Sequence, residues 1–209
     1  MCSKLLLINV LLAATLLAQD ANRTQPGTLP NEADRAVPTS SSTVEPLTVK
    51  EKFRYRFRHT IDPLNIVLSA ATAGLDHWRR YPDEWGTGWD AYGARFASSY
   101  GQHIIGEQLM FAVEAVDHED PRRPHPQATT FKGRMWEAIK FTFVVQRDGG
   151  GWMPAYSRFV ADFGTAAISR YGWYPAEFHN FQNVIDIGFS NLGTDLGMNM
   201  LRELLHRNN

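Results

Sequence analysis

Apolar residues recur every three or four positions along most of this chain, the spacing that lines one face of an α-helix. The pattern is clearest near the C-terminus, where it predicts a helix from about Ala176 to His206. The apolar stripe of this helix consists of Phe178, Phe181, Ile185, Phe189, Leu192, Leu196 and Met200. Together with the segments described next, this periodicity predicts an all-α fold, a bundle of five or six helices.

Capping signals predict the starts of the first two helices. Thr48 and Glu51 have the spacing of a capping box, which favours a helix over residues 49–59. The alternation of basic and aromatic residues between positions 52 and 58 would also fit a strand, but the cap favours the helix. The pair Asp62-Pro63 predicts a second helix that runs to about residue 80.

Turn residues predict the limits of the central helices. We expect one long helix over about 89–119, or two helices joined near Gly101 or Gly106. A fourth helix is predicted over about 130–146, before a run of three glycines, and Ser157 is expected to cap a fifth that ends near Tyr171.

The N-terminus has the pattern of an export signal. Lys4 supplies a positive charge, and the run from Leu5 to Ala18 is apolar but shorter than the roughly 18 residues that a membrane-spanning helix needs. We therefore expect residues 1–18 to be a signal peptide that is removed near Ala18.

Composition changes after the signal. Residues 19–47 contain prolines and serines without an apolar period, which is typical of a disordered linker, and the helical domain is expected over 48–207. The only cysteine, Cys2, would leave with the signal. The mature chain would then have neither disulfides nor a thiol nucleophile.

The overall charge is close to balanced, with 21 Lys+Arg against 22 Asp+Glu. This argues against nucleic acid as a partner, and no mature segment has an apolar run long enough for a transmembrane helix. The basic and aromatic segment 50–58 is compatible with an anionic membrane surface or an envelope protein as partner. A solvated basic face that covers the core is the simpler interpretation, because charged side chains on a short helix normally point to water. The expected location is the periplasm or cell envelope.

Two histidines and two carboxylates fall on one side of the long predicted helix. At 100° per residue, His103, Glu107, Glu114 and His118 occupy a sector of about 60°. Imidazole and carboxylate are ligands for zinc or iron, and such a pair also suits acid-base catalysis. Solvated ion pairs along an exposed face are the alternative explanation.

A second group of polar residues is expected to bind an anion or another ligand. Arg95 and Arg170 would hold the anion, and His179 and Asp186 lie on a polar line beside the apolar stripe of the last helix. Structural hydrogen bonds between helices would also explain these residues.

Several short motifs resemble a group of exported bacterial helical proteins of no established activity. They are Tyr92-Gly-x-Arg95-Phe96, His118-x-Asp120-Pro121-Arg122, Ser169-Arg170 and Tyr174-Pro175. Ser99-Tyr-Gly-Gln-His103 and the segment 169–175 are also loosely similar to the phosphatidic acid phosphatase and vanadium haloperoxidase superfamily. That superfamily's second histidine would fall at Ala176, three residues before His179, so its chemistry would be lost or moved.

These observations predict an exported binding or structural interaction module of the cell envelope. The alternative is a phosphatase-like hydrolase or a metal-binding protein that uses the His103 to His118 face; the sequence identifies no ligand, metal or cofactor. An enzyme needs at least two of the candidate groups to converge in a pocket. A module would spread them over the surface or bury them in pairs.

Overall fold

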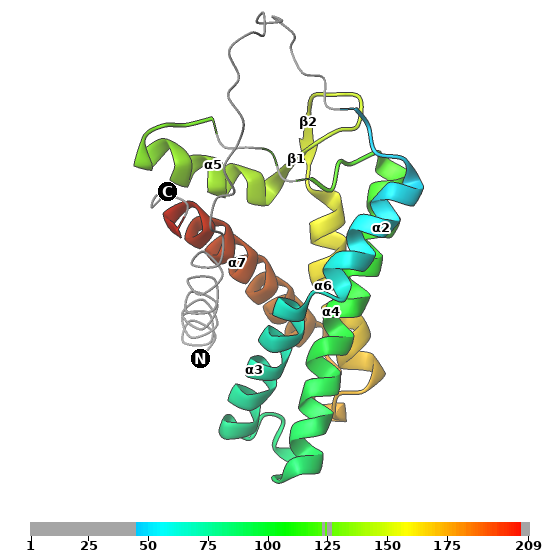
Figure 1. The fold of residues 1–209 in the computed structure, drawn as a ribbon. Helices are drawn as coiled ribbons and strands as arrows, with labels where there is room; N and C mark the ends of the chain where they lie inside the picture. Colours follow the sequence, from blue (N-terminus) through cyan, green and yellow to red (C-terminus); the bar gives the residue numbers. More distant parts are fainter. Residues whose placement is uncertain (1–44, 123, 125–126, 206–209) are drawn as a thin grey trace, which may run out of the picture.

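The computed structural model describes residues 45–122, 124 and 127–205 (Figure 1). Six α-helices make up most of the described chain: α2 (Val49–Thr60), α3 (Pro63–Arg79), α4 (Trp89–Asp117), α5 (Phe131–Phe143), α6 (Tyr156–Gly172) and α7 (Phe181–Leu205). The prediction of an all-α bundle is confirmed. The predicted signal 1–18 and the predicted linker up to residue 44 lie outside the described residues.

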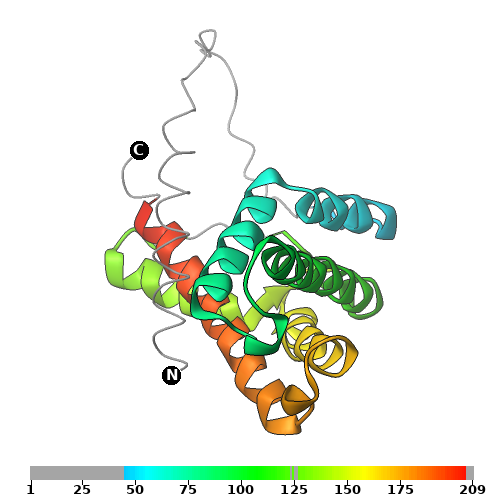
Figure 2. The same cartoon turned by 90° about the horizontal axis from the view of Figure 1, so that it is seen from below.

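Helix α4 is the centre of the bundle. It contacts α2, α3 and α6, whereas α7 packs on α6 and α5 packs on α7. Seen from below, α2 and α6 lie on opposite sides of α4 (Figure 2). Because α2 reaches Glu107 and Glu114 while α3 reaches Tyr92, these two helices cover the C-terminal and N-terminal halves of α4 in turn.

The predicted helix starts at Thr48 and Asp62 are confirmed. The Thr48 hydroxyl accepts from the backbone N–H of Glu51, whose carboxylate accepts from the backbone N–H of Thr48. Asp62 caps α3 by accepting from the backbone N–H of Leu64 at 2.9 Å. Helix α4 is continuous through both glycines at which a break was considered, and it ends at Asp117.

The predicted helix over 130–146 is wrong at its C-terminal end. Helix α5 stops at Phe143, and β1 (Val144–Gln146) pairs antiparallel with β2 (Trp152–Pro154). Val144 and Val145 are β-branched and favour a strand, and the glycine run that follows allows the chain to turn back, since Gly150 and Gly151 have φ of 86° and 88°. The helix period therefore ends three residues earlier than expected.

The expected cap at Ser157 is also wrong. Helix α6 begins at Tyr156, one residue before Ser157, so the Ser157 side chain lies inside the first turn. The buried carboxylate of Glu119 supplies the missing acceptor, because it accepts from the Ser157 backbone N–H at 3.0 Å and from its hydroxyl at 2.6 Å. A negative charge at a helix N-terminus is stabilised by the helix dipole.

The apolar stripe predicted on α7 is only partly buried. Leu192 is buried, whereas Phe181 and Phe189 are 74% and 61% exposed. Phe189 touches only the edge of Phe163 on α6, and a Cβ added at Gly188 would collide with the same ring. The close approach of α6 at Gly188 thus selects which side of α7 is covered.

Many large apolar side chains of the described residues remain on the surface, while several charged ones are buried. Trp78, Trp89 and Trp136 are exposed, whereas Lys52 and Glu114 are each only 1% exposed. Across the described part of the chain, no helix combines the length and the apolar character needed to cross a bilayer.

Candidate functional site

Helix α2 turns three of its basic side chains toward α4 and leaves an apolar stripe half exposed. Lys52, Arg56, His59 and Thr60 lie on the side that packs against α4, and Lys52 and Thr60 are buried. Val49, Phe53, Phe57 and Ile61 lie on the exposed side, where about half of each side chain is accessible. Phe53 still contacts the ring of Phe111 on α4, with ring centres 5.3 Å apart. On an ordinary surface helix the apolar stripe faces the core and the charged side chains face water, so the buried charges and half-exposed stripe of α2 are unusual.

Lys52 closes the C-terminal end of α4. Its ammonium donates to the backbone carbonyls of Glu114 at 2.9 Å and Glu119 at 2.7 Å and forms an ion pair with Asp148 at 2.6 Å. A cation near the last carbonyls of a helix interacts favourably with the helix dipole. The acidic C-terminal end of α4 is therefore stabilised from α2, and Arg122 also folds back onto Asp120.

Arg56 binds two of the predicted site residues. Its guanidinium lies 3.2 Å from the Glu107 carboxylate and makes a two-pronged contact with Glu114. Burial raises the pKa of Glu114, and Arg56 offsets this only in part. Burial also acts to raise the pKa of Glu107, but the hydrogen bond with His59 and the charge of Arg56 outweigh it, so this pKa falls below its ordinary value.

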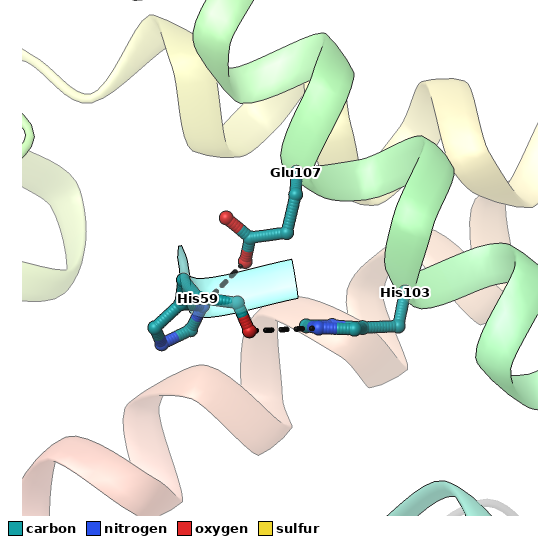
Figure 3. Close-up of side chains that lie close together, drawn as sticks. All are labelled: His59, His103 and Glu107. Carbon is teal, nitrogen blue, oxygen red and sulfur yellow. Dashed lines mark hydrogen bonds and ion pairs between the residues drawn. The ribbon is translucent and has the colours of Figure 1, made fainter. Parts of the chain in front are cut away.

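His59, His103 and Glu107 come together where α2 ends beside α4 (Figure 3). His59 Nδ1 lies 2.8 Å from Glu107 Oε1, and His103 Nε2 lies 3.4 Å from the backbone oxygen of His59. One ligand atom from each side chain falls within 4.8 Å of the other two. Burial lowers the pKa of His103, which favours its neutral form.

A surface groove of about 520 Å³ reaches this cluster at His59. It is lined by Leu47, Glu51, Arg54, Tyr55, Arg58, His59, Asp62 and Arg122. The three arginines make the walls of the groove more basic than acidic. A small anion or a solvated ion entering the groove would therefore meet the exposed side of His59.

The fourth residue predicted for this face lies elsewhere. His118 has φ of 58° and forms the C-cap of α4, where the chain turns away from the helix. Its side chain is 74% exposed, and its Nδ1 lies 3.8 Å from Asp148. The helical angle assigned to His118 did not apply because the helix ends one residue before it.

Arg95 and Arg170 lie beside one aromatic cluster, formed by Tyr81, Tyr174 and Phe178. The buried guanidinium of Arg95 donates to the carbonyl oxygens of Tyr81, Pro82, Gly86 and Ala91. It thereby holds the loop between α3 and α4 in place. The guanidinium of Arg170 lies 3.7 Å from the centre of the Tyr174 ring, and its Nε and Nη1 are buried without a hydrogen-bond partner among the described residues.

His179 and Asp186, the other predicted ligand residues, are not brought together. His179 Nε2 lies 2.8 Å from the backbone oxygen of Tyr174, near Arg170. Asp186 is exposed and accepts from Gln182 one turn earlier on α7.

The sequence analysis did not single out Asp76. Burial raises the pKa of this carboxyl group to about 6, although the charges of Arg79, Arg95 and Arg170 act in the opposite direction.

Sequence reasoning also missed Lys52, Arg56 and His59. These residues were assigned to a solvated basic face, because charged side chains on a short helix normally point to water. A signal was available: positions 52, 56 and 59 share one side of a helix, opposite the strongly basic positions 50, 54 and 58.

No family model matches this chain, and it matches neither a curated protein nor a solved structure. The chemistry of the described residues therefore carries the functional argument. Two features are unusual. Helix α2 buries charged side chains and exposes an apolar stripe, and two imidazoles meet a carboxylate at the end of a groove.

Proposed function

We propose that the protein is an exported cell-envelope binding module that attaches to an anionic lipid surface through α2. The observation that carries this proposal is the outer side of α2, where an apolar stripe of Val49, Phe53, Phe57 and Ile61 is exposed. Helices that lie in a membrane interface bury such a stripe among the acyl chains and headgroups.

The charges beside the stripe fit an anionic surface. Lys50, Arg54 and Arg58 are exposed and, at 100° per residue, occupy the sector next to the stripe. Their positive heads would lie at the level of the phosphates while the phenyl rings enter the apolar layer. Lys52 and Arg56, in contrast, are already engaged by carboxylates inside the protein.

Vesicle binding tests this function. The wild-type protein should sediment with vesicles that contain an anionic phospholipid, more weakly with purely zwitterionic vesicles, and less as salt screens the charges. The double variant Arg54→Gln/Arg58→Gln should bind about thirtyfold more weakly, since each basic residue near such a surface contributes about 1 kcal/mol.

An apolar variant separates insertion from simple charge attraction. Phe57→Ser should weaken binding by tenfold or more, because the burial of a phenylalanine contributes roughly 1.5 to 3 kcal/mol. The control is Trp136→Ser, which removes a 67% exposed aromatic side chain from α5 and should leave binding unchanged. Equal loss in both variants, or none in either, would refute the role of α2.

Export is tested separately. The apolar run that ends at Ala18 supports cleavage there and delivery to the cell envelope. N-terminal sequencing of the protein recovered from outside the cytoplasm should give a chain that begins near Gln19. Recovery of only the uncleaved chain, in the cytoplasm, would refute this part of the proposal.

A phosphatase-like hydrolase is the second candidate. It is favoured by the meeting of His59, His103 and Glu107 at a groove whose walls contain three arginines. Neutral imidazole beside a carboxylate suits general base catalysis. Hydrolysis of an activated phosphate ester by the purified protein, abolished by His103→Ala, would favour this candidate over the lipid-binding module.

A further inference from the structure

We propose that His59, His103 and Glu107 bind one divalent transition-metal ion, of the zinc or cobalt class, that joins α2 to α4. The donor atoms are His59 Nδ1, His103 Nε2 and Glu107 Oε1, from side chains that lie within 4.8 Å of one another. Two imidazoles and one carboxylate form a ligand set of the kind found in catalytic zinc sites, which keep a further position open.

The donors need only small shifts to surround an ion. Zinc binds nitrogen and carboxylate oxygen at about 2.0 to 2.2 Å, which places tetrahedral ligands roughly 3.3 Å apart. His59 Nδ1 and Glu107 Oε1 are 2.8 Å apart and would separate slightly. His103 would approach by a rotation of its side chain, since its ring already lies beside His59 with centres 6.1 Å apart.

The surroundings prepare the carboxylate for this role. Arg56 approaches Glu107 through Oε2 at 3.2 Å, so the other oxygen remains available on the side of His59. An outer partner of this kind fixes the orientation of a metal-binding carboxylate. Glu114 also pairs with Arg56, so the two carboxylates leave a net negative charge after the guanidinium is neutralised.

A metal ion binds imidazole in its neutral form and a carboxylate in its ionised form. The groove gives an ion a path to His59, whose side chain is 42% exposed, and leaves space for water or a small anion at an open position.

Cobalt(II) is the probe that tests the site. The tag-free full chain is stripped with a chelator and titrated with Co²⁺, and binding is followed by visible absorption, whose intensity reports the coordination number. We expect one equivalent per chain, displaced by Zn²⁺. We expect binding at least tenfold weaker in both His59→Ala and His103→Ala.

The matched control is His118→Ala. This histidine lies at the end of the same helix, is 74% exposed and is not part of the cluster, so its removal should leave the titration unchanged. Circular dichroism monitors folding, and His59→Ala keeps the test valid if His103→Ala unfolds, because His59 is the more exposed of the two. Absence of stoichiometric binding to the wild type, or equal affinity in the His59 and control variants, would overturn the proposal.

Discussion

Two of the interfaces of helix α4, those with α2 and α6, have opposite character. On one side, long charged side chains of α2 reach Glu107 and Glu114, and Phe53 adds an edge-on contact with Phe111. On the other side, α6 approaches closely through small residues: a Cβ at Gly164 would lie 3.0 Å from Leu109, and Ala161 and Ala166 are buried. One helix is attached by ion pairs and the other by close packing.

The two kinds of attachment respond differently to change. Close packing loses stability in proportion to the atoms removed and the cavity left behind. A buried ion pair contributes little net stability when intact, because desolvation offsets the attraction, yet removal of one partner leaves the other buried and uncompensated. The stability of the α2 interface should therefore depend strongly on the loss of one charged partner and only weakly on side-chain volume.

Of the substitutions considered, Lys52→Met should lower the free energy of unfolding the most. The variant leaves Asp148 and the carbonyls of Glu114 and Glu119 without their common donor, and we expect a loss of about 3 to 5 kcal/mol in the free energy of unfolding. Denaturant melts provide the measurement. The control Lys50→Met changes an exposed residue on the same helix and should stay within about 0.5 kcal/mol of the wild type.

Leu192→Ala examines the packed part of the molecule. Leu192 is buried on α7, and truncation should lower the free energy of unfolding by roughly 2 to 5 kcal/mol in the same melts. Phe181→Ala, on the same helix but 74% exposed, should cost less than about 0.5 kcal/mol. A reversed order would contradict the burial of Leu192 and the exposure of Phe181.

The stability of the protein should also depend on pH through a carboxylate where α6 meets α7. Burial and the nearby charge of Asp195 raise the pKa of Asp162 to about 8, while Arg158 acts in the opposite direction. Between pH 4 and pH 8 the folded chain therefore keeps a proton that the unfolded chain has lost. The free energy of unfolding should fall as the pH rises through this window.

Asp162→Asn should remove that dependence. We expect the variant to match the wild type near pH 4 and to become more stable than the wild type as the pH rises toward 8, by up to about 1.4 kcal/mol per pH unit, as measured by denaturant melts across the range. Asp186→Asn, at an exposed position on α7, is the control and should show the wild-type profile. Parallel profiles for the wild type and Asp162→Asn would contradict the assigned protonation.

The parts of the fold that depend on local chemistry were predictable from the sequence. The capping box at Thr48 and the Asp62-Pro63 pair are contained within a few residues, and both gave correct helix starts. The cap of α6 was not predictable, because its acceptor, Glu119, is 38 residues away from Ser157. The end of α5 was missed because a β-branched pair and the pairing with β2 across the glycine turn decide it together.

Only part of the candidate site was predictable from the sequence, again because local spacing can be read along the chain and distant contacts cannot. The spacing of His103 and Glu107 on one helix indicated a shared face, and the structure brings them together. His59 completes the cluster from α2, 44 residues before His103, and helical periodicity within one segment contains no information about such a neighbour. The inward orientation of Lys52, Arg56 and His59 on α2 was not predicted because basic residues were expected to face water.

The three bonds of the Lys52 ammonium also have a consequence for the order of folding. They reach 62, 67 and 96 residues along the chain, so they form only after α4 and the β-hairpin are in place. Helix α2 should therefore join last and open first. In native-state hydrogen exchange, its amides should exchange through a local opening that leaves those of α6 protected.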